Sequence, residues 1–101
     1  MAVAQRRIGK YITDPQRADI VPGMQMLVKS KKWYSDNSDD WGTVCINRYY
    51  NFTAEMSDFL GKVVTVEGVH HYEGLGDTEV FSIKEDGGRF RWCREMFDKV
   101  W

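Results

Sequence analysis

No run of apolar residues in this 101-residue sequence approaches the roughly 20 residues that a helix needs to cross a bilayer. The first seven residues also lack the apolar core of a secretory signal peptide. We therefore expect no membrane span, and we expect the protein to stay in the cytoplasm of the cell that makes it. A chain of this length has room for one domain with one core.

Cysteine is scarce, and its pattern does not suggest a metal centre. Cys45 and Cys93 are far apart in the chain, whereas the ligands of a tetrahedral zinc site usually come in close pairs. His70 and His71 are adjacent, so on a strand they point to opposite faces. We expect two free thiols, since the cytosol keeps thiols reduced, and no metal or other cofactor.

The sequence shows no couple of residues that would carry out catalysis. A cysteine nucleophile needs an activating base, but Cys93 follows Trp92 in an apolar stretch and should fill space in the core. Glu85 and Asp86 are paired carboxylates, but they stand at an expected hairpin turn. We therefore predict that the protein is not an enzyme.

An excess of charge of one sign is also missing, because 14 basic residues balance 15 acidic ones. No global field draws the chain to nucleic acid or to an anionic membrane. Basic residues do cluster in the N-terminal arm and again at 29–32, and they are Arg6, Arg7, Lys10, Arg17, Lys29, Lys31 and Lys32. The acidic stretch that follows is not a calcium loop, because Trp41 stands where such a loop needs glycine and Asn47 where it needs glutamate.

Alternating apolar and β-branched residues predict a mainly β fold. The expected strands cover residues 24–29, 62–67 with an extension to 72, 79–84, 89–92 and 97–101. A tight hairpin turn is expected at 86–88, a long first loop at 30–51, and a short helical turn at 53–60, capped by Thr53 and ended by Gly61. The inward side chains should be Val64, Val66, Phe81, Ile83 and Trp92.

This order of elements predicts a small five-stranded SH3-like barrel over residues 21–101, preceded by an N-terminal arm over 1–20. The arm is expected either to dock on the barrel or to await a partner. An OB-fold is the rival architecture, but it usually has longer strands and a helix between its third and fourth strands. The sequence shows no helix there, which favours the SH3-like barrel.

Aromatic and acidic residues gather in or beside the long first loop, where the core does not obviously need them. This composition suits a protein partner, because aromatic rings are enriched at interfaces. The predicted partner-binding residues are Trp33, Tyr34, Asp36, Asp39, Asp40, Trp41, Tyr49 and Tyr50. Two alternatives remain open: the rings pack a small cluster under the loop, or the barrel binds nucleic acid through the basic arm and the Lys29–Lys32 region.

Two stretches of the sequence resemble a known family. Residues 53–66 contain TAEM followed by LGKVVTV, and residues 83–97 contain IKED, FRW and EMF. This pattern is similar to that of short proteins found in bacteriophages, mobile elements and Gram-positive bacteria, and the similarity covers about residues 22–101. The chain departs from the pattern at Phe90, where a first tryptophan is usual, at Cys93, and in a longer turn at 73–78.

The resemblance implies an SH3-like fold and a phage or prophage source, with a bacterial host whose cytoplasm holds the protein. Small phage proteins without catalytic machinery often cap a host enzyme or a defence complex. By analogy, we expect a non-catalytic protein-binding module that inhibits a host protein or defence system, in the manner of an anti-CRISPR protein. The expected partner is a host or phage protein.

Overall fold

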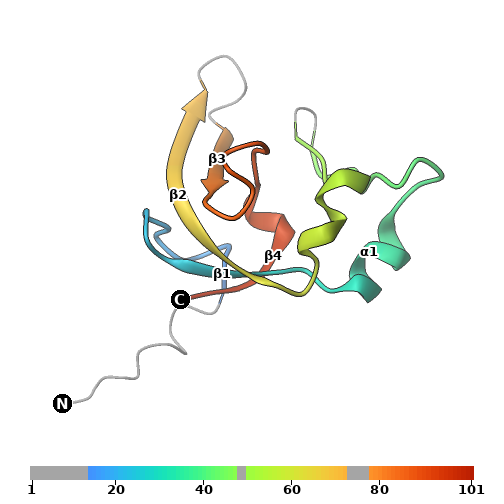
Figure 1. Ribbon diagram of the computed structural model, residues 1–101, viewed down its shortest axis with the longest axis horizontal. Coiled ribbons are helices and arrows are strands. Elements are labelled where there is room, and N and C mark those ends of the chain that lie inside the picture. The colour runs from blue at the N-terminus through green and yellow to red at the C-terminus, as the bar shows by residue number, and fades with distance from the viewer. Residues whose placement is uncertain (1–13, 48–49, 73–77) are drawn as a thin grey trace.

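Four antiparallel strands form one open sheet in the computed structural model, which describes residues 14–47, 50–72 and 78–101. The strands β1 (Gln25–Val28), β2 (Val63–Tyr72), β3 (Thr78–Ile83) and β4 (Phe97–Val100) lie in the order β3-β2-β1-β4 (Figure 1). The helices are α1 (Lys31–Asn37) and two 3₁₀ segments, η2 (Ala54–Phe59) and η3 (Arg94–Met96). The predicted mainly β class is confirmed. In these ranges no helix combines the length and apolar character needed to cross a membrane.

Strand β2 is the long central element, and it pairs with a different neighbour along each half. Its first half pairs with β1, where Val64 lies opposite Met26. From Val66 onward it pairs with β3, with a register shift between Val66 and Gly68. The chain ends on β4, which returns to the other edge of β1. A single bent strand therefore joins the two parts of the sheet.

The predicted fifth strand at 89–92 is present only as one bridge, between Phe81 of β3 and Trp92. The reason is that the backbone N–H groups of Arg89 and Phe90 donate to Asp86 and not to a neighbouring strand. Shortly after Trp92 the chain turns into η3. The described residues therefore contain four strands where the alternation of charge and ring predicted five.

The long first loop is more structured than its composition indicates. Ser30 caps helix α1 by accepting a hydrogen bond from the Trp33 N–H at 3.1 Å. Further along, Val44 and Phe52 form a bridge with hydrogen bonds of 2.8 and 3.0 Å. The helical turn predicted at 53–60 is confirmed as η2, and Gly61 follows it with a φ of 74°. Helix α1 was not predicted.

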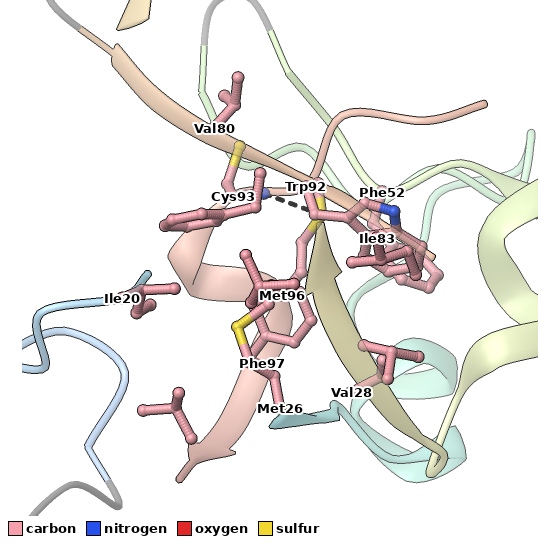
Figure 2. Close-up of a cluster of buried hydrophobic side chains, with 14 of the residues drawn as sticks. Ile20, Met26, Val28, Phe52, Val80, Ile83, Trp92, Cys93, Met96 and Phe97 are labelled. Carbon is pink, nitrogen blue, oxygen red and sulfur yellow. Dashed lines mark hydrogen bonds between the residues drawn. The ribbon is translucent and has the colours of Figure 1, made fainter. Parts of the chain in front are cut away.

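The core is centred on Trp92, which has no exposed surface. Its ring centroid lies 5.8 Å from that of Phe52, 5.7 Å from that of Phe59 and 5.7 Å from that of Phe97. Figure 2 shows Trp92, Phe52 and Ile83 gathered on one side of the core, with Met96 and Phe97 beside them. All of the side chains predicted to point inward are buried, and they are Val64, Val66, Phe81, Ile83 and Trp92.

Residues 14–20, the described part of the predicted arm, pack on the body of the domain. Ala18 and Ile20 belong to the buried core. The Arg94 guanidinium donates hydrogen bonds to the backbone carbonyls of Pro15 and Ala18, and it also forms an ion pair with Glu79 at 2.6 Å. This segment is therefore docked. Residues 1–13 of the arm lie outside the described residues.

The tight turn predicted at 86–88 is confirmed, since Gly87 and Gly88 have φ angles of 67° and 79°. Asp86 holds this turn with both carboxylate oxygens. Its Oδ1 accepts from the N–H groups of Gly88 at 2.7 Å and Arg89 at 3.2 Å. Its Oδ2 accepts from the Phe90 N–H at 3.1 Å and from the Trp92 indole N–H at 2.9 Å. One carboxylate thus connects the turn to the central core ring.

We predict that Asp86→Ala lowers the free energy of unfolding by about 2–4 kcal/mol, because it leaves four donors without their charged acceptor. Asp86→Asn should cost less, because its amide oxygen can still accept the two turn bonds. Urea denaturation monitored by tryptophan fluorescence measures both values. Asp58→Ala, which removes an exposed carboxylate elsewhere, is the matched control. An Asp86→Ala protein as stable as that control would contradict the role of this carboxylate.

Candidate functional site

An open pocket of about 460 Å³ lies between the later part of the first loop and the segment that follows the tight turn. The first loop and η2 supply one side, and residues 89–91 supply the other. The lining residues are Thr43, Tyr50, Asn51, Thr53, Glu55, Met56, Arg89, Phe90 and Arg91. The volume is within the range of small-ligand and side-chain sites, about 300–1,000 Å³.

Two arginines and one glutamate give this pocket a net positive charge. Arg89 Nη2 lies 3.1 Å from Glu55 Oε2, and both side chains are about two-thirds exposed, at 63% and 66%. The Arg89 guanidinium also lies over the ring of Phe90, at 4.8 Å from its centroid. Arg91 donates from Nη1 to the Gly88 carbonyl at 3.1 Å. An anionic group is therefore the ligand that the electrostatics favour.

Polar groups of the first loop border the same pocket. Asn51 Oδ1 accepts hydrogen bonds from the N–H groups of Ile46 at 2.8 Å and Asn47 at 3.3 Å, which fixes the loop at this point. The hydroxyl oxygen of Thr53 is buried and has no hydrogen-bond partner among the residues described. The pocket therefore combines charged, amide and hydroxyl groups with the apolar surface of Phe90 and Met56.

A tight turn at 39–43 adjoins the pocket, because its last residue, Thr43, lines it. Asp39 organises the turn: its Oδ1 accepts from the N–H groups of Trp41 at 2.9 Å and Thr43 at 3.0 Å. Backbone bonds from Asp39 N–H to the Thr43 carbonyl and from Gly42 N–H to the Asp39 carbonyl complete it. The side chain of Trp41 is 85% exposed on this turn.

The predicted binding rings Trp33 and Tyr34 pack against the core, and Tyr34 also bonds to this turn. Both are half-buried and pack on Phe52, with centroid distances of 5.3 and 5.7 Å. The Tyr34 hydroxyl donates to the Gly42 carbonyl at 2.6 Å. Gly42 has a φ of 78°, and an added Cβ would stand 2.8 Å from the Tyr34 hydroxyl, so this contact requires glycine. These two rings form the packed cluster that the sequence left open as an alternative.

The other predicted partner-binding residues occupy different places. Asp36 forms an ion pair with Lys32 at 2.7 Å, and Asp40 is exposed beside Trp41. Tyr50 is half-buried and lines the pocket. Tyr49 lies outside the described residues. Of the predicted set, the structure thus brings Tyr50 to the pocket and Asp39, Asp40 and Trp41 to the adjoining turn.

Sequence reasoning missed the charged side of the pocket, which Glu55, Arg89 and Arg91 supply. The signal was present in part, because residues 89–92 alternate arginine and ring. That alternation was interpreted as a strand with one solvated face. The arginines border a pocket because η2 packs close to this segment, although the two are more than thirty positions apart in the sequence. Sequence alone does not show this approach.

The basic cluster at 29–32 is mostly paired with acids. Lys29 lies 2.9 Å from Asp98, and Lys32 lies 2.7 Å from Asp36. Lys31 is exposed. The basic residues of the arm up to Lys10 lie outside the described residues, whereas Arg17 is described and exposed.

The histidines and cysteines lie in separate environments. His70 Nε2 lies 3.1 Å from the Ser82 hydroxyl, and His71 Nε2 lies 3.3 Å from Glu79. Cys45 is exposed and Cys93 is buried. Burial raises the pKa of the Cys93 thiol to about 11, opposed by the hydrogen bond from Asn47 and supported by the charge of Glu95. Such a thiol is a poor nucleophile at neutral pH.

Comparison with known proteins gives no relative for this chain: no family model, no curated protein and no solved structure matches it.

We predict that the two thiols differ sharply in reactivity toward Ellman's reagent at pH 8. Cys45 should react at once, whereas a pKa of about 11 leaves about one Cys93 thiol in a thousand ionised, and that thiol is buried. Native Cys45→Ala protein should therefore react only after urea is added. Rapid reaction of native Cys45→Ala protein would contradict the packing described for Cys93.

Proposed function

We propose that this chain is a non-catalytic protein-binding module whose main contact residue is Trp41. The observation that carries this function is a tryptophan that is 85% exposed on a turn held by five hydrogen bonds. Large exposed rings are costly in water, and tryptophan is among the residues that dominate binding energy at protein interfaces. A ring displayed in this way is therefore best explained as a contact for a partner.

The rigidity of the turn supports the same conclusion. Binding loses part of its free energy in ordering loops and side chains, and a contact that is already ordered loses less. Asp39 and Tyr34 fix the backbone on both sides of Trp41 in the free protein. When a partner covers Trp41, only the rotation of its indole side chain then has to be restricted, because the backbone of the turn is already ordered.

Three groups considered for catalysis are held in structural contacts or buried, and this favours binding without catalysis. Glu85 accepts hydrogen bonds from the N–H and the hydroxyl of Thr65 at 2.8 and 3.0 Å. Asp86 is occupied by the tight turn and Trp92. Cys93 is buried with a raised pKa.

We further propose that the sheet is an SH3-like barrel in which one strand is shortened to a single bridge. Three features support this assignment: β4 returns to pair with β1, a 3₁₀ turn directly precedes β4, and Trp92 bridges to β3 where a further strand is expected. In this interpretation the excursion between β1 and β2, which carries α1, Trp41 and η2, is the long first loop of the barrel.

The resemblance to short proteins of phages and mobile elements supports a phage or prophage source. In that setting the module would act in the cytoplasm of a bacterial host, binding a host protein or a component of a defence system and blocking it. Nucleic-acid binding has less support, because Lys29 and Lys32 are paired with Asp98 and Asp36.

The test is affinity capture from a host lysate with immobilised wild-type and Trp41→Ala proteins, quantified by mass spectrometry. We expect wild type to retain a stoichiometric partner, and the Trp41→Ala protein to bind it about 30-fold more weakly, the effect of losing about 2 kcal/mol. Trp101→Ala is the matched control, since Trp101 is a partly exposed tryptophan at the end of the chain, 41% exposed.

Two results would count against this function. One is the absence of any stoichiometric partner at micromolar protein concentration. The other is a partner that Trp41→Ala captures as well as Trp101→Ala does, which would place the interface away from the 39–43 turn.

A further inference from the structure

We propose that the pocket beside Trp41 binds a carboxylate side chain carried by an acidic segment of the partner protein. This inference rests on the proposed function, because it names the chemistry of the partner at a second contact point. It concerns the pocket and not Trp41 itself. The pocket lining includes Arg89, Arg91, Glu55, Tyr50 and Phe90.

The charge of the pocket lining favours an anionic group. Among the described residues, two guanidinium groups and one carboxylate line the pocket, so this part of the lining has a formal charge of plus one. Arginine presents a planar set of donors that matches a carboxylate in a two-bond arrangement. A single added carboxylate would leave the lining neutral overall.

The contact with Glu55 already shows that the Arg89 guanidinium binds a carboxylate. Glu55 Oε2 makes a 3.1 Å contact with Arg89 Nη2, and both side chains are mostly exposed. Exposed ion pairs of this kind contribute little free energy because water and salt screen them. A partner's carboxylate can therefore replace Glu55 on Arg89 at small cost, and Glu55 acts as an internal competitor.

The lining also has an apolar part. Phe90 is half-buried with Arg89 stacked over its ring, and Tyr50 and Met56 add further apolar surface. This surface suits an aliphatic residue next to the acidic one in an extended segment. An acidic peptide with an aliphatic neighbour therefore fits the lining better than a free inorganic anion.

A polyanion fits less well. The adjoining turn and α1 carry the exposed acidic residues Asp36, Asp39 and Asp40, and the turn leads directly into the pocket at Thr43. Successive phosphates of a nucleic acid would meet these like charges, whereas one carboxylate seated on Arg89 need not. We therefore favour a protein segment over a nucleic acid.

The experiment is a titration of ¹⁵N-labelled protein with the blocked peptide acetyl-Gly-Glu-Leu-Glu-Gly-amide, followed by ¹H–¹⁵N correlation spectra. Shift changes are expected at Thr43, Asn51, Glu55 and residues 89–91. The matched peptide with glutamine in place of both glutamates should bind at least about tenfold more weakly, the effect expected from losing a charge-assisted hydrogen bond.

Three variants separate this role from a structural one. Arg89→Gln should weaken binding of the glutamate peptide about tenfold, whereas Glu55→Gln should strengthen it about threefold, because the internal competitor is removed. Lys84→Gln is the control, since it removes an exposed positive charge outside the pocket lining. A purely structural ion pair predicts that Arg89→Gln and Glu55→Gln act in the same direction.

The outcomes distinguish this inference from the proposed function. The peptide titration reports on the Arg89 pocket and the lysate capture reports on Trp41, so peptide binding can succeed even if the Trp41 interface is wrong. Equal binding of the glutamine peptide, or weaker binding by Glu55→Gln, would overturn the carboxylate site. Stronger shift changes with an eight-residue oligothymidylate than with the glutamate peptide would overturn it in favour of nucleic acid.

Discussion

The hydrogen bond from the Trp92 indole to Asp86, at 2.9 Å, is the interaction on which the rest of the structure depends. A fully buried indole N–H needs an acceptor, because leaving it unpaired costs about 1–3 kcal/mol. Asp86 supplies that acceptor from the same carboxylate that closes the Gly87-Gly88 turn. The position of the central ring and the shape of the hairpin are thus determined together.

From Trp92 a continuous series of ring contacts leads to the proposed binding surface. Trp92 packs on Phe52, and Phe52 packs on Trp33 and Tyr34 of α1. The hydroxyl of Tyr34 then holds the turn that presents Trp41, by its bond to Gly42. The same hairpin that Asp86 closes continues into Arg89 and Phe90 at the pocket. Core and candidate site are therefore parts of one packed unit.

The sequence was sufficient to predict the core and four of the five expected strands, because alternation of apolar residues reports directly on which side chains face inward. Val64, Val66, Phe81 and Ile83 are buried as that pattern indicates. The turn at Gly87 and Gly88 was equally predictable, since positive φ at both positions needs a residue such as glycine. These features depend on residues that are near one another in the chain.

The features that escaped prediction depend on contacts between distant segments. Helix α1 has few strong helix formers, and its rings are stabilised by packing on Phe52 rather than by local preference. The pocket requires η2 to approach the segment after the hairpin, which the Glu55–Arg89 contact shows. Asp86 was interpreted as a solvated turn residue, because nothing local reveals that its second oxygen meets a core indole.

Backbone ¹⁵N relaxation across residues 39–43 tests the central claim most directly, namely that Trp41 is displayed on a turn as rigid as the sheet. We expect order parameters of about 0.85, equal to those of β1 and β2, together with rapid solvent exchange of the Trp41 indole N–H. Order parameters below about 0.6 at these residues would contradict it, since the exposed ring would then belong to a flexible loop and not to a preformed contact.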